Sequence, residues 1–299
     1  MNKLMAMAAF RRVAELGSFT AAARDLGLSS AAVSNYVRQI EAHLGVTLLV
    51  RSTRKVALSE IGKAYLPKVQ ALLDAIEEAE DTARGLQTTP HGRLHVNAPA
   101  TFGLLHVNPF VPDFVRRHPR VTLDLSFNDR VVDLIEERVD IALRVSRALP
   151  DSTLVARRLA TIRRTVCATP DYIARHGRPE RPKDLVRHAC ITYTLSDSVQ
   201  DWSLGGSRVP IGGPVRADSS IAVRDLTLAG LGISMMPRFI AGPDLLAGRL
   251  VPLLEEHPTE DLTLYAVFPP GVRPSVKLRA FVDGFVAFLG DPPRWERMG

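Results

Sequence analysis

The chain of 299 residues is 46% hydrophobic and 23% charged, which is typical of a soluble protein of two or three domains and excludes a mainly disordered or fibrous chain. Only 2 cysteines are present, which excludes a disulfide scaffold, and no apolar run approaches the length of about 18 residues that spans a membrane, so we expect a cytoplasmic protein. The net charge of +6 is uneven: residues 1–68 carry 10 basic against 4 acidic side chains and residues 69–90 carry 1 against 5, so a polyanion is expected to bind the N-terminal part.

Three helices are expected at the start of the chain, over residues 3–16, 19–26 and 30–44. Gly17 and Gly45 end the first and the third, and Ser29 is a suitable N-cap for the third. Arg11 and Arg12 end the first apolar run after about seven residues, so no signal peptide is expected. A helix, a glycine turn and a second helix of these lengths predict a helix-turn-helix.

The third helix has two distinct faces. One is an apolar stripe that is expected to be buried, formed by Val33, Val37, Ile40 and Leu44. The opposite face is small and polar with one arginine, and consists of Ala31, Ser34, Asn35 and Arg38. Short side chains let a recognition helix enter the major groove, where Asn and Arg read base edges. The alternative is the solvated face of any small helical bundle.

Residues 48–58 are expected to form a short β-ribbon, or wing, next to this helix. Arg51, Arg54 and Lys55 lie around its turn. Cations on a loop beside a recognition helix are suited to phosphate contacts.

A long helix is expected over residues 59–87, with Ser59 as its cap. Its apolar positions follow a heptad spacing, and they are Tyr65, Val69, Leu72, Ile76, Ala79, Ala83 and Leu86. Such a seam is typical of a coiled coil and predicts a dimerisation helix. The alternative is a helix that packs onto the C-terminal domain of its own chain.

Residues 10–29 (FRRVAELGSFTAAARDLGLS), 32–34 (AVS) and 38–46 (RQIEAHLGV) resemble the N-terminal domain of LysR-type transcriptional regulators. The sequence departs from the family pattern at Leu49, where Phe is usual, and at Asn35 and Tyr36, where a basic residue is common. The resemblance implies a winged helix-turn-helix domain over 1–58 that binds double-stranded DNA, and a linker helix over 59–87. It also implies a homodimer that builds tetramers, with RNA polymerase as a possible partner. The residues expected to contact DNA are Ser30, Ala31, Ser34, Asn35, Arg38, Arg51, Arg54 and Lys55.

Residues 88–92 are rich in turn formers and are expected to form a hinge before the C-terminal domain, 93–299. Strands are expected over 94–97, 121–127, 141–145, 166–168, 190–193, 215–217, 232–235 and 262–268. Helices are expected over 102–117, 131–138, 170–175, 221–229 and 275–289. This alternation predicts an α/β domain with mostly parallel strands.

The family's effector domain is similar to type II periplasmic binding proteins, whose chain crosses twice between two α/β lobes. The resemblance implies a first lobe over about 93–164 and 266–290 and a second over about 165–265, with crossings near Ile162 and Ala266.

Hydroxyl side chains lie at two of the expected helix starts, Thr101 after the first strand and Ser219 with Ser220 in the second lobe. Ligands of open α/β sheets bind beyond the carboxyl ends of strands, and helix starts favour anions there. We therefore expect a small effector with a carboxylate, and its expected contacts are Ala100, Thr101, Phe102, Arg144, Ser219 and Ser220. The alternative is that the hydroxyls are ordinary N-caps and Arg144 is a surface residue.

No phosphate loop, H-E-x-x-H or G-x-S-x-G motif occurs, and Cys and His never gather at metal-ligand spacing, so no catalytic residues, metal or cofactor are expected. Cys167 and Cys190 lie in expected buried strands without neighbouring cations, which favours inert thiols over a redox switch. Three classes of protein remain: a DNA-binding regulator with a sensing domain, a solute-binding protein, and an α/β enzyme with an accessory helical domain.

Overall fold

A computed structural model of the chain describes residues 2–51, 56–84, 89–130, 133–134, 136–137, 139–149, 154–196, 199–269 and 275–296. The side chains at 51, 77–79 and 81–84 lie outside this description. The chain divides into two compact units, 1–88 and 89–299, and each is described by itself. Among the described helices, none has both the length and the hydropathy needed to cross a membrane.

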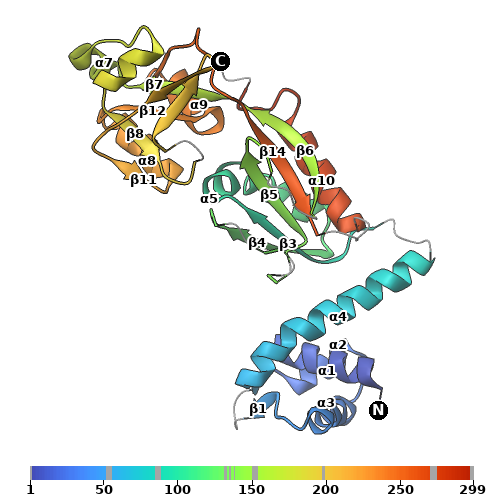
Figure 1. Ribbon diagram of the computed structural model, residues 1–299. Helices are drawn as coiled ribbons and strands as arrows, with labels where there is room; N and C mark the ends of the chain where they lie inside the picture. The colour runs from blue at the N-terminus through green and yellow to red at the C-terminus, as the bar shows by residue number, and fades with distance from the viewer. Residues whose placement is uncertain are drawn as a thin grey trace. The chain divides into compact units, whose positions relative to one another are not determined.

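The N-terminal unit is a three-helix bundle with a β-ribbon and a long fourth helix (Figure 1). Its elements are α1 (Lys3–Leu16), α2 (Phe19–Asp25), α3 (Ser30–Leu44), β1 (Leu49–Arg51), β2 (Val56–Leu58) and α4 (Glu60–Arg84). The side chains of Asn2, Ser18 and Ser29 cap the first three helices by accepting from a backbone N–H three residues on. Gly17 and Gly45 end α1 and α3 in the left-handed conformation, which glycine adopts without strain. The expected winged helix-turn-helix is confirmed.

The C-terminal unit contains two five-stranded sheets, one in each lobe. The sheet of lobe I has the order β4 (Val121–Phe127), β3 (Gly92–Ala98), β5 (Ile141–Ser146), β14 (Leu262–Phe268), β6 (Val155–Ile162). Its helices are α5 (Ala100–Phe102), a π-helical turn η1 (Gly103–Val107), α6 (Val111–Arg117) and α10 (Val276–Leu289). In Figure 1 the orange β14 lies beside the green β5, although the whole of lobe II separates them in sequence.

The sheet of lobe II has the order β11 (Arg216–Ala217), β8 (Cys190–Tyr193), β12 (Ile233–Pro237), β7 (Arg164–Ala168), β13 (Val251–Leu253). Its helices are α7 (Pro170–His176), η2 (Pro182–Arg187), α8 (Ser220–Leu228) and α9 (Arg238–Leu246). A hairpin of β9 (Asp201–Leu204) and β10 (Ser207–Pro210) stands apart from the sheet. This hairpin, β6, β13 and α9 were not expected from the sequence.

The expectation of mostly parallel strands is wrong. In each sheet two neighbouring pairs are parallel and two are antiparallel. In lobe II the antiparallel pairs are β7 with β12 and β7 with β13. In lobe I they are β14 with β5 and β14 with β6. One residue, Arg163, joins β6 of lobe I to β7 of lobe II, and β14 returns to lobe I antiparallel to both β5 and β6.

Two boundaries differ from the expected ones. All of β14 pairs within lobe I, so the second crossing lies before Leu262 and not near Ala266. The helix expected over 102–117 is split into α5, η1 and α6, with Pro109 in the turn that separates the last two. The helix expected over 131–138 falls largely outside the described residues, and the described ones there form turns.

Candidate DNA-binding and effector sites

The recognition helix α3 separates an apolar from a polar face as predicted, except at its end. Val33, Val37 and Ile40 are at most 1% exposed and pack into the core of the unit. Leu44, expected in the same stripe, is 39% exposed because it is the last residue of the helix, beyond the reach of α1. On the other face Ser30, Ala31, Asn35 and Arg38 are exposed and Ser34 is half-buried. The structure therefore brings all five helix residues of the predicted DNA-contacting set to one accessible surface.

The ribbon is held against this helix by Glu41. Its Oε1 accepts hydrogen bonds from the backbone N–H groups of Leu48 (2.8 Å) and Leu49 (3.1 Å), which lead into β1. The Arg51 side chain, Arg54 and Lys55, predicted to contact phosphates, lie outside the described residues.

Two arginines of α1 are engaged in ion pairs within the unit. Arg12 makes a two-point contact with Asp25 at 2.5 Å, and the hydrogen bonds from Arg12 lower the pKa of that carboxyl. Arg11 pairs with Glu15 and with Asp74 of α4, each at 3.1 Å. Part of the N-terminal positive charge therefore holds the bundle together and is not presented to a partner.

The predicted dimerisation seam of α4 divides into two parts. Val69 is 1% exposed and packs into the core of its own unit, and Tyr65 packs on Phe10 of α1 with ring centroids 5.7 Å apart. Val69 is therefore not available to a partner helix, and the half-buried Tyr65 already contacts its own unit. Leu72 is 45% exposed and Ile76 is half-buried. The side chains of Ala79 and Ala83, and the whole of Leu86, lie outside the described residues.

A cavity of about 240 Å³ lies between the two lobes. Apolar and aromatic side chains form much of its wall, and they include Phe102, Val145, Ile191, Tyr193, Leu195, Trp202, Val223, Met235, Met236, Phe239 and Leu262. Polar side chains also reach it from both lobes, and they are Thr101, Asp129, Ser146, Arg147, Arg164, Thr192, Ser196 and Ser220. An apolar cavity with a few polar groups is the usual form of a small-molecule site.

Three of the six predicted effector contacts line this cavity: Thr101, Phe102 and Ser220. Ser219 does not; its hydroxyl caps α8 by accepting from the N–H of Ala222 at 3.4 Å. The two helix starts are thus brought to one cavity, with Thr101 from lobe I and Ser220 from lobe II.

The expected anion site at the start of α5 is already filled. The N–H of Ala100 donates to Asp129 Oδ1 at 2.9 Å, and α5 has only 3 residues. A helix this short carries little dipole, and the Asp129 carboxylate repels a second anion. Burial raises the pKa of Tyr193 on the facing lobe, and the charge of Asp129 adds to the effect.

Arg144 does not line the cavity, contrary to expectation. Its guanidinium turns to the neighbouring strand and donates to Asn97 Oδ1 at 2.6 Å and to the carbonyl of Leu143 at 3.0 Å. Asn97 is fully buried and needs this partner. Burial also lowers the pKa of Arg144.

Arg147 and Arg164 supply the positive charge of the cavity. Arg147 forms an ion pair with Glu260 and lowers the pKa of that carboxyl, while Arg164 Nε donates to the Glu260 carbonyl at 2.8 Å. Sequence reasoning missed Arg147 and Asp129, although each follows a predicted strand by two residues. Ligands of open α/β sheets bind beyond the carboxyl ends of strands, so the positions of Arg147 and Asp129 just after two predicted strands are the signal that indicates them.

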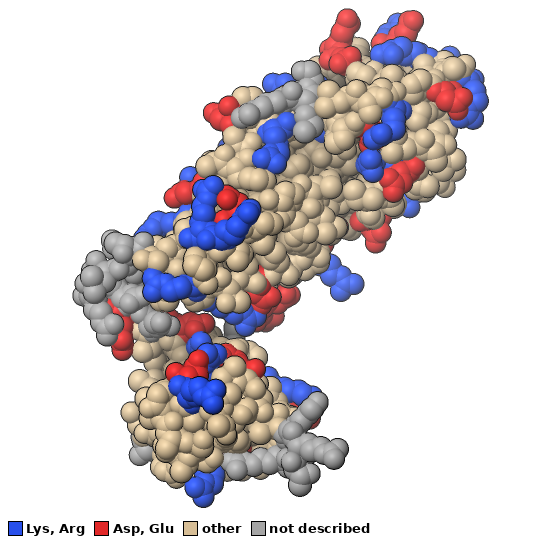
Figure 2. Space-filling view, turned by 180° about the vertical axis from the view of Figure 1, so that it is seen from behind, with Lys and Arg blue, Asp and Glu red and all other residues tan. Residues whose placement is uncertain are grey.

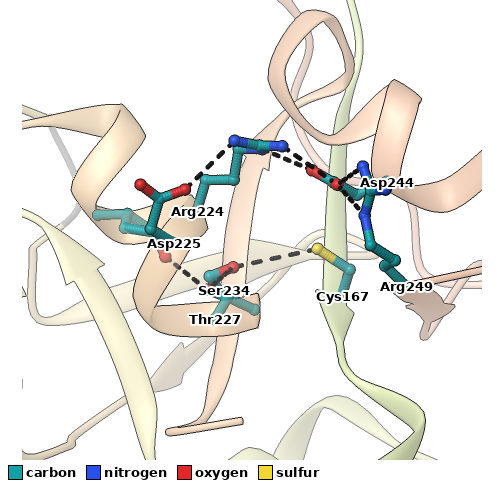
Figure 3. A network of polar contacts seen from close by, with 8 residues as sticks. Cys167, Arg224, Asp225, Thr227, Ser234, Asp244 and Arg249 are labelled. Carbon is teal, nitrogen blue, oxygen red and sulfur yellow. Dashed lines mark hydrogen bonds and ion pairs between the residues drawn. The ribbon is translucent and has the colours of Figure 1, made fainter. Parts of the chain in front are cut away.

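A buried polar network fixes α8, whose first residue Ser220 lines the cavity (Figure 3). The carboxylate of Asp244 on α9 is fully buried and accepts hydrogen bonds from Arg224 of α8 and from Arg249, at 2.5–3.2 Å. Burial alone would raise the pKa of Asp244, but the two guanidinium groups outweigh it and lower the value. Two helices of lobe II are thereby locked to each other.

The two cysteines are buried thiols. Cys167 Sγ lies 4.0 Å from the hydroxyl of Ser234 (Figure 3). Burial raises the pKa of both Cys167 and Cys190 to about 12, so neither is a thiolate at neutral pH. The thiolate is the reactive form, so the environment favours inert cysteines.

Acidic and basic side chains alternate over the face of the C-terminal unit seen in Figure 2. That face offers no single-sign patch of the kind that binds nucleic acid. Among the described residues, no three His, Cys, Asp or Glu side chains are grouped so as to hold a metal ion.

Both units match known protein families. Residues 4–63 match the bacterial regulatory helix-turn-helix proteins of the lysR family, and residues 87–289 match the LysR substrate binding domain. An uncharacterised HTH-type transcriptional regulator of Haemophilus influenzae is 35% identical over 275 residues, which cover 90% of this chain and 94% of the relative.

The HTH-type transcriptional regulator CrgA of Neisseria meningitidis serogroup C is 36% identical over 287 residues, which cover 94% of this chain and 95% of the relative. The solved structure of CrgA, a LysR-type regulator from Neisseria meningitidis, superposes with a TM-score of 0.62 at 34% identity and covers 96% of this chain and 98% of that one.

These matches extend over both units. They favour the DNA-binding regulator over the other two classes considered from the sequence, a solute-binding protein and an α/β enzyme. The chain belongs to the LysR family of transcriptional regulators, with a DNA-binding helix-turn-helix followed by an effector-binding domain.

Proposed function

We propose that the protein reads an operator through α3 and is modulated by a small acidic effector held between the lobes of its C-terminal unit. The exposed polar face of α3 carries the DNA part of the proposal. Arg38 and Asn35 are exposed on it, whereas the opposite stripe is buried. Arg and Asn are the side chains that read G and A in the major groove, and the small Ala31 lets the helix approach.

Pairing of two protomers along α4 supports binding to two half-sites, and pairing of such dimers would give a tetramer. The accessible apolar side chains of the described part of α4 are Ile61, Ala64, Ala71, Leu72 and Ala75. Ile61 and Ala64 lie three residues apart, Ala71 follows Ala64 by seven, and Leu72 and Ala75 lie three apart, so all five fall on one face of the helix, as a helix–helix seam requires. The dimer therefore uses this face and not Tyr65 or Val69. Contact with RNA polymerase is the route by which the bound protein would alter transcription.

The effector part of the proposal is supported by the chemistry of the interlobe cavity. Its size and aromatic wall suit a compound with a compact apolar body. Arg147 and Arg164 are the two cations that line the cavity and would bind the carboxylate, whereas Asp129 brings negative charge to the start of α5. Thr101 and Ser220 then bind neutral polar groups of the effector, one from each lobe.

An electrophoretic mobility shift with the DNA that flanks the protein's own gene tests the proposal. Specific binding is expected to weaken steeply with salt, by a log–log slope of about −5 if a dimer neutralises roughly six phosphates. Effector-free and carboxylate-loaded protein are then compared on the same fragment. Binding that is insensitive to salt, or equal on unrelated DNA, would contradict the assignment of α3 as a reading helix.

A further inference from the structure

The segment that follows α10 returns to the junction between the lobes. Trp295 is 2% exposed, and its ring centroid lies 4.8 Å from that of His106 and 5.8 Å from that of Phe102. It lies 6.2 Å from the ring of Phe239, at the start of α9. His106 and Phe102 belong to lobe I and Phe239 to lobe II, so one side chain contacts both lobes.

The next residue is tied to the first crossing of the chain. Arg163 is the one residue between β6 and β7, and its N–H donates to Glu296 Oε1 at 3.0 Å. The Arg163 carbonyl in turn accepts the N–H of Arg238, the first residue of α9, at 2.8 Å. Glu296 Oε2 lies 3.8 Å from Arg163 Nε and 4.0 Å from Arg238 Nη1. The carboxylate therefore joins the crossing to lobe II.

The same cluster forms the back of the effector cavity. Phe102 and Phe239 line the cavity from opposite lobes and meet edge to face, with centroids 5.3 Å apart and ring planes at 89°. Edge-to-face pairs depend on geometry, so a support behind the two rings controls how the lobes meet. Trp295 and His106 are that support.

The cluster also leaves two buried polar atoms without hydrogen bonds. Within the described residues no partner is found for Trp295 Nε1 or for Glu296 Oε2, and the polar neighbour of the His106 ring is the backbone of Phe239 in lobe II. His106 is 8% exposed, and burial lowers its pKa to about 4, against a backbone hydrogen bond with Phe239 that raises it and with a smaller lowering by the Arg294 guanidinium. Proton uptake by His106 is therefore unfavourable while the cluster stays closed.

Few charged groups surround His106. Arg294 and Glu296 come from its own side of the cluster, in the turn after α10, and Arg238 comes from the start of α9. The ring contacts of His106 are all aromatic, with Phe102 of α5, Phe239 of α9 and Trp295. Glu296 carries the one carboxylate among these groups, and it accepts from the Arg163 N–H, so the hydrogen bond with the Phe239 backbone is what offsets the burial of a protonated His106.

We propose that Trp295 and Glu296 form a clamp across the first crossing that positions the two aromatic walls of the effector cavity, and that protonation of His106 opens it. Trp295 and His106 are positioning residues, since they act through Phe102 and Phe239. The proposal rests on the assignment of the cavity as the effector site. A histidine whose pKa is lowered in the closed form takes up its proton first in the opened form, so the closed form is lost as pH falls from 6.5 toward 4.

Hydrogen–deuterium exchange of the full chain, corrected for the intrinsic pH dependence, tests the clamp without any effector. With pKa values of 6.5 in the opened form and about 4 in the closed form, the opened population rises about twentyfold between pH 7 and pH 5. Exchange in η1 and α9 is expected to rise by this factor in the wild type. His106→Phe should abolish the rise, and the matched control His176→Phe, whose ring stacks on Tyr172 away from the clamp, should retain it.

Trp295→Ala should raise exchange in the same two segments already at pH 7, while β8 stays protected. Trp295→Phe should restore much of the protection. Glu296→Ala removes no aromatic ring, although the Glu296 side chain is only 9% exposed, and it should also loosen both segments, so the test does not depend on the folding of the tryptophan variant. An unchanged pH response in His106→Phe, or full protection in both Trp295→Ala and Glu296→Ala, would overturn the proposal. Neither result would bear on the assignment of the cavity as the effector site, which is tested separately by ligand binding.

Discussion

The ion-pair network around Asp244 gives a prediction whose size follows from the structure. Asp244 is fully buried between Arg224 and Arg249, whose side chains are 27% and 55% exposed. Removing one partner of a buried pair costs about 3–5 kcal/mol, because the other charge is left without compensation. Both arginines are partly exposed and can be solvated in the variant, which reduces this loss of stability. We therefore expect Asp244→Asn to lower the free energy of unfolding of the C-terminal unit by about 2–3 kcal/mol.

Urea unfolding followed by tryptophan fluorescence measures this loss selectively, because Trp202 and Trp295 are the only two tryptophans and both lie in residues 89–299. The guanidinium groups hold the pKa of Asp244 below its ordinary value of 3.8. The stabilisation is consequently present above pH 3.8 and is lost as pH falls through the lowered pKa of the folded state. The difference between wild type and variant should therefore narrow below about pH 3.8.

Asp225→Asn is the matched control, since this carboxylate lies 3.2 Å from the same Arg224 but is 60% exposed. An exposed pair contributes little, so the control should change stability by less than about 0.5 kcal/mol. A loss below about 1 kcal/mol for Asp244→Asn, or equal losses for the two variants, would refute the reasoning that burial makes this network important.

Three further predictions concern the two sites. Arg38→Ala should weaken operator binding by about 1–3 kcal/mol and leave random DNA unaffected in a mobility shift, whereas equal losses would mean a phosphate contact. Val69→Ala should destabilise the N-terminal unit by about 2 kcal/mol without dissociating the proposed dimer. Leu72→Lys should dissociate that dimer in sedimentation experiments without destabilising the protomer. The reverse pattern would contradict the assignment of Val69 to the core and of Leu72 to the dimer interface. A carboxylate that changes Trp202 fluorescence should lose most of its affinity in Arg164→Met, and unchanged affinity would place the acid group elsewhere.

Much of the N-terminal unit could be predicted from sequence because its signals are local. Serine caps, glycine stops and the apolar spacing of α3 identified three helices and the polar face, with Leu44 as the exception at a helix end. The heptad seam of α4 was also real as a pattern. A heptad seam indicates that one face of a helix is buried, but it does not identify the segment that packs on that face. Here α1 of the same chain packs on Tyr65 and Val69.

In the C-terminal unit the sequence determined the α/β class and identified two helix starts, at Thr101 and Ser220, that line the interlobe cavity, since both follow strands. It could not determine strand direction, because that depends on where the chain crosses between lobes. Nor could it place long side chains: Arg144 reaches sideways to Asn97, whereas Arg147, three residues on, reaches the cavity.

The proposed clamp likewise joins residues that are far apart in the sequence, so its contacts could not be predicted from local patterns. Nothing local to Trp295 or Glu296 indicates that they meet His106 and Arg163, well over 100 positions earlier in the chain. Local propensity and periodicity are properties of neighbouring residues, and they determined the helices, the caps and the polar face of α3. Which charges are paired, which apolar face of α4 stays exposed and which residues join the two lobes depend on contacts between distant segments, and only the tertiary structure decided them.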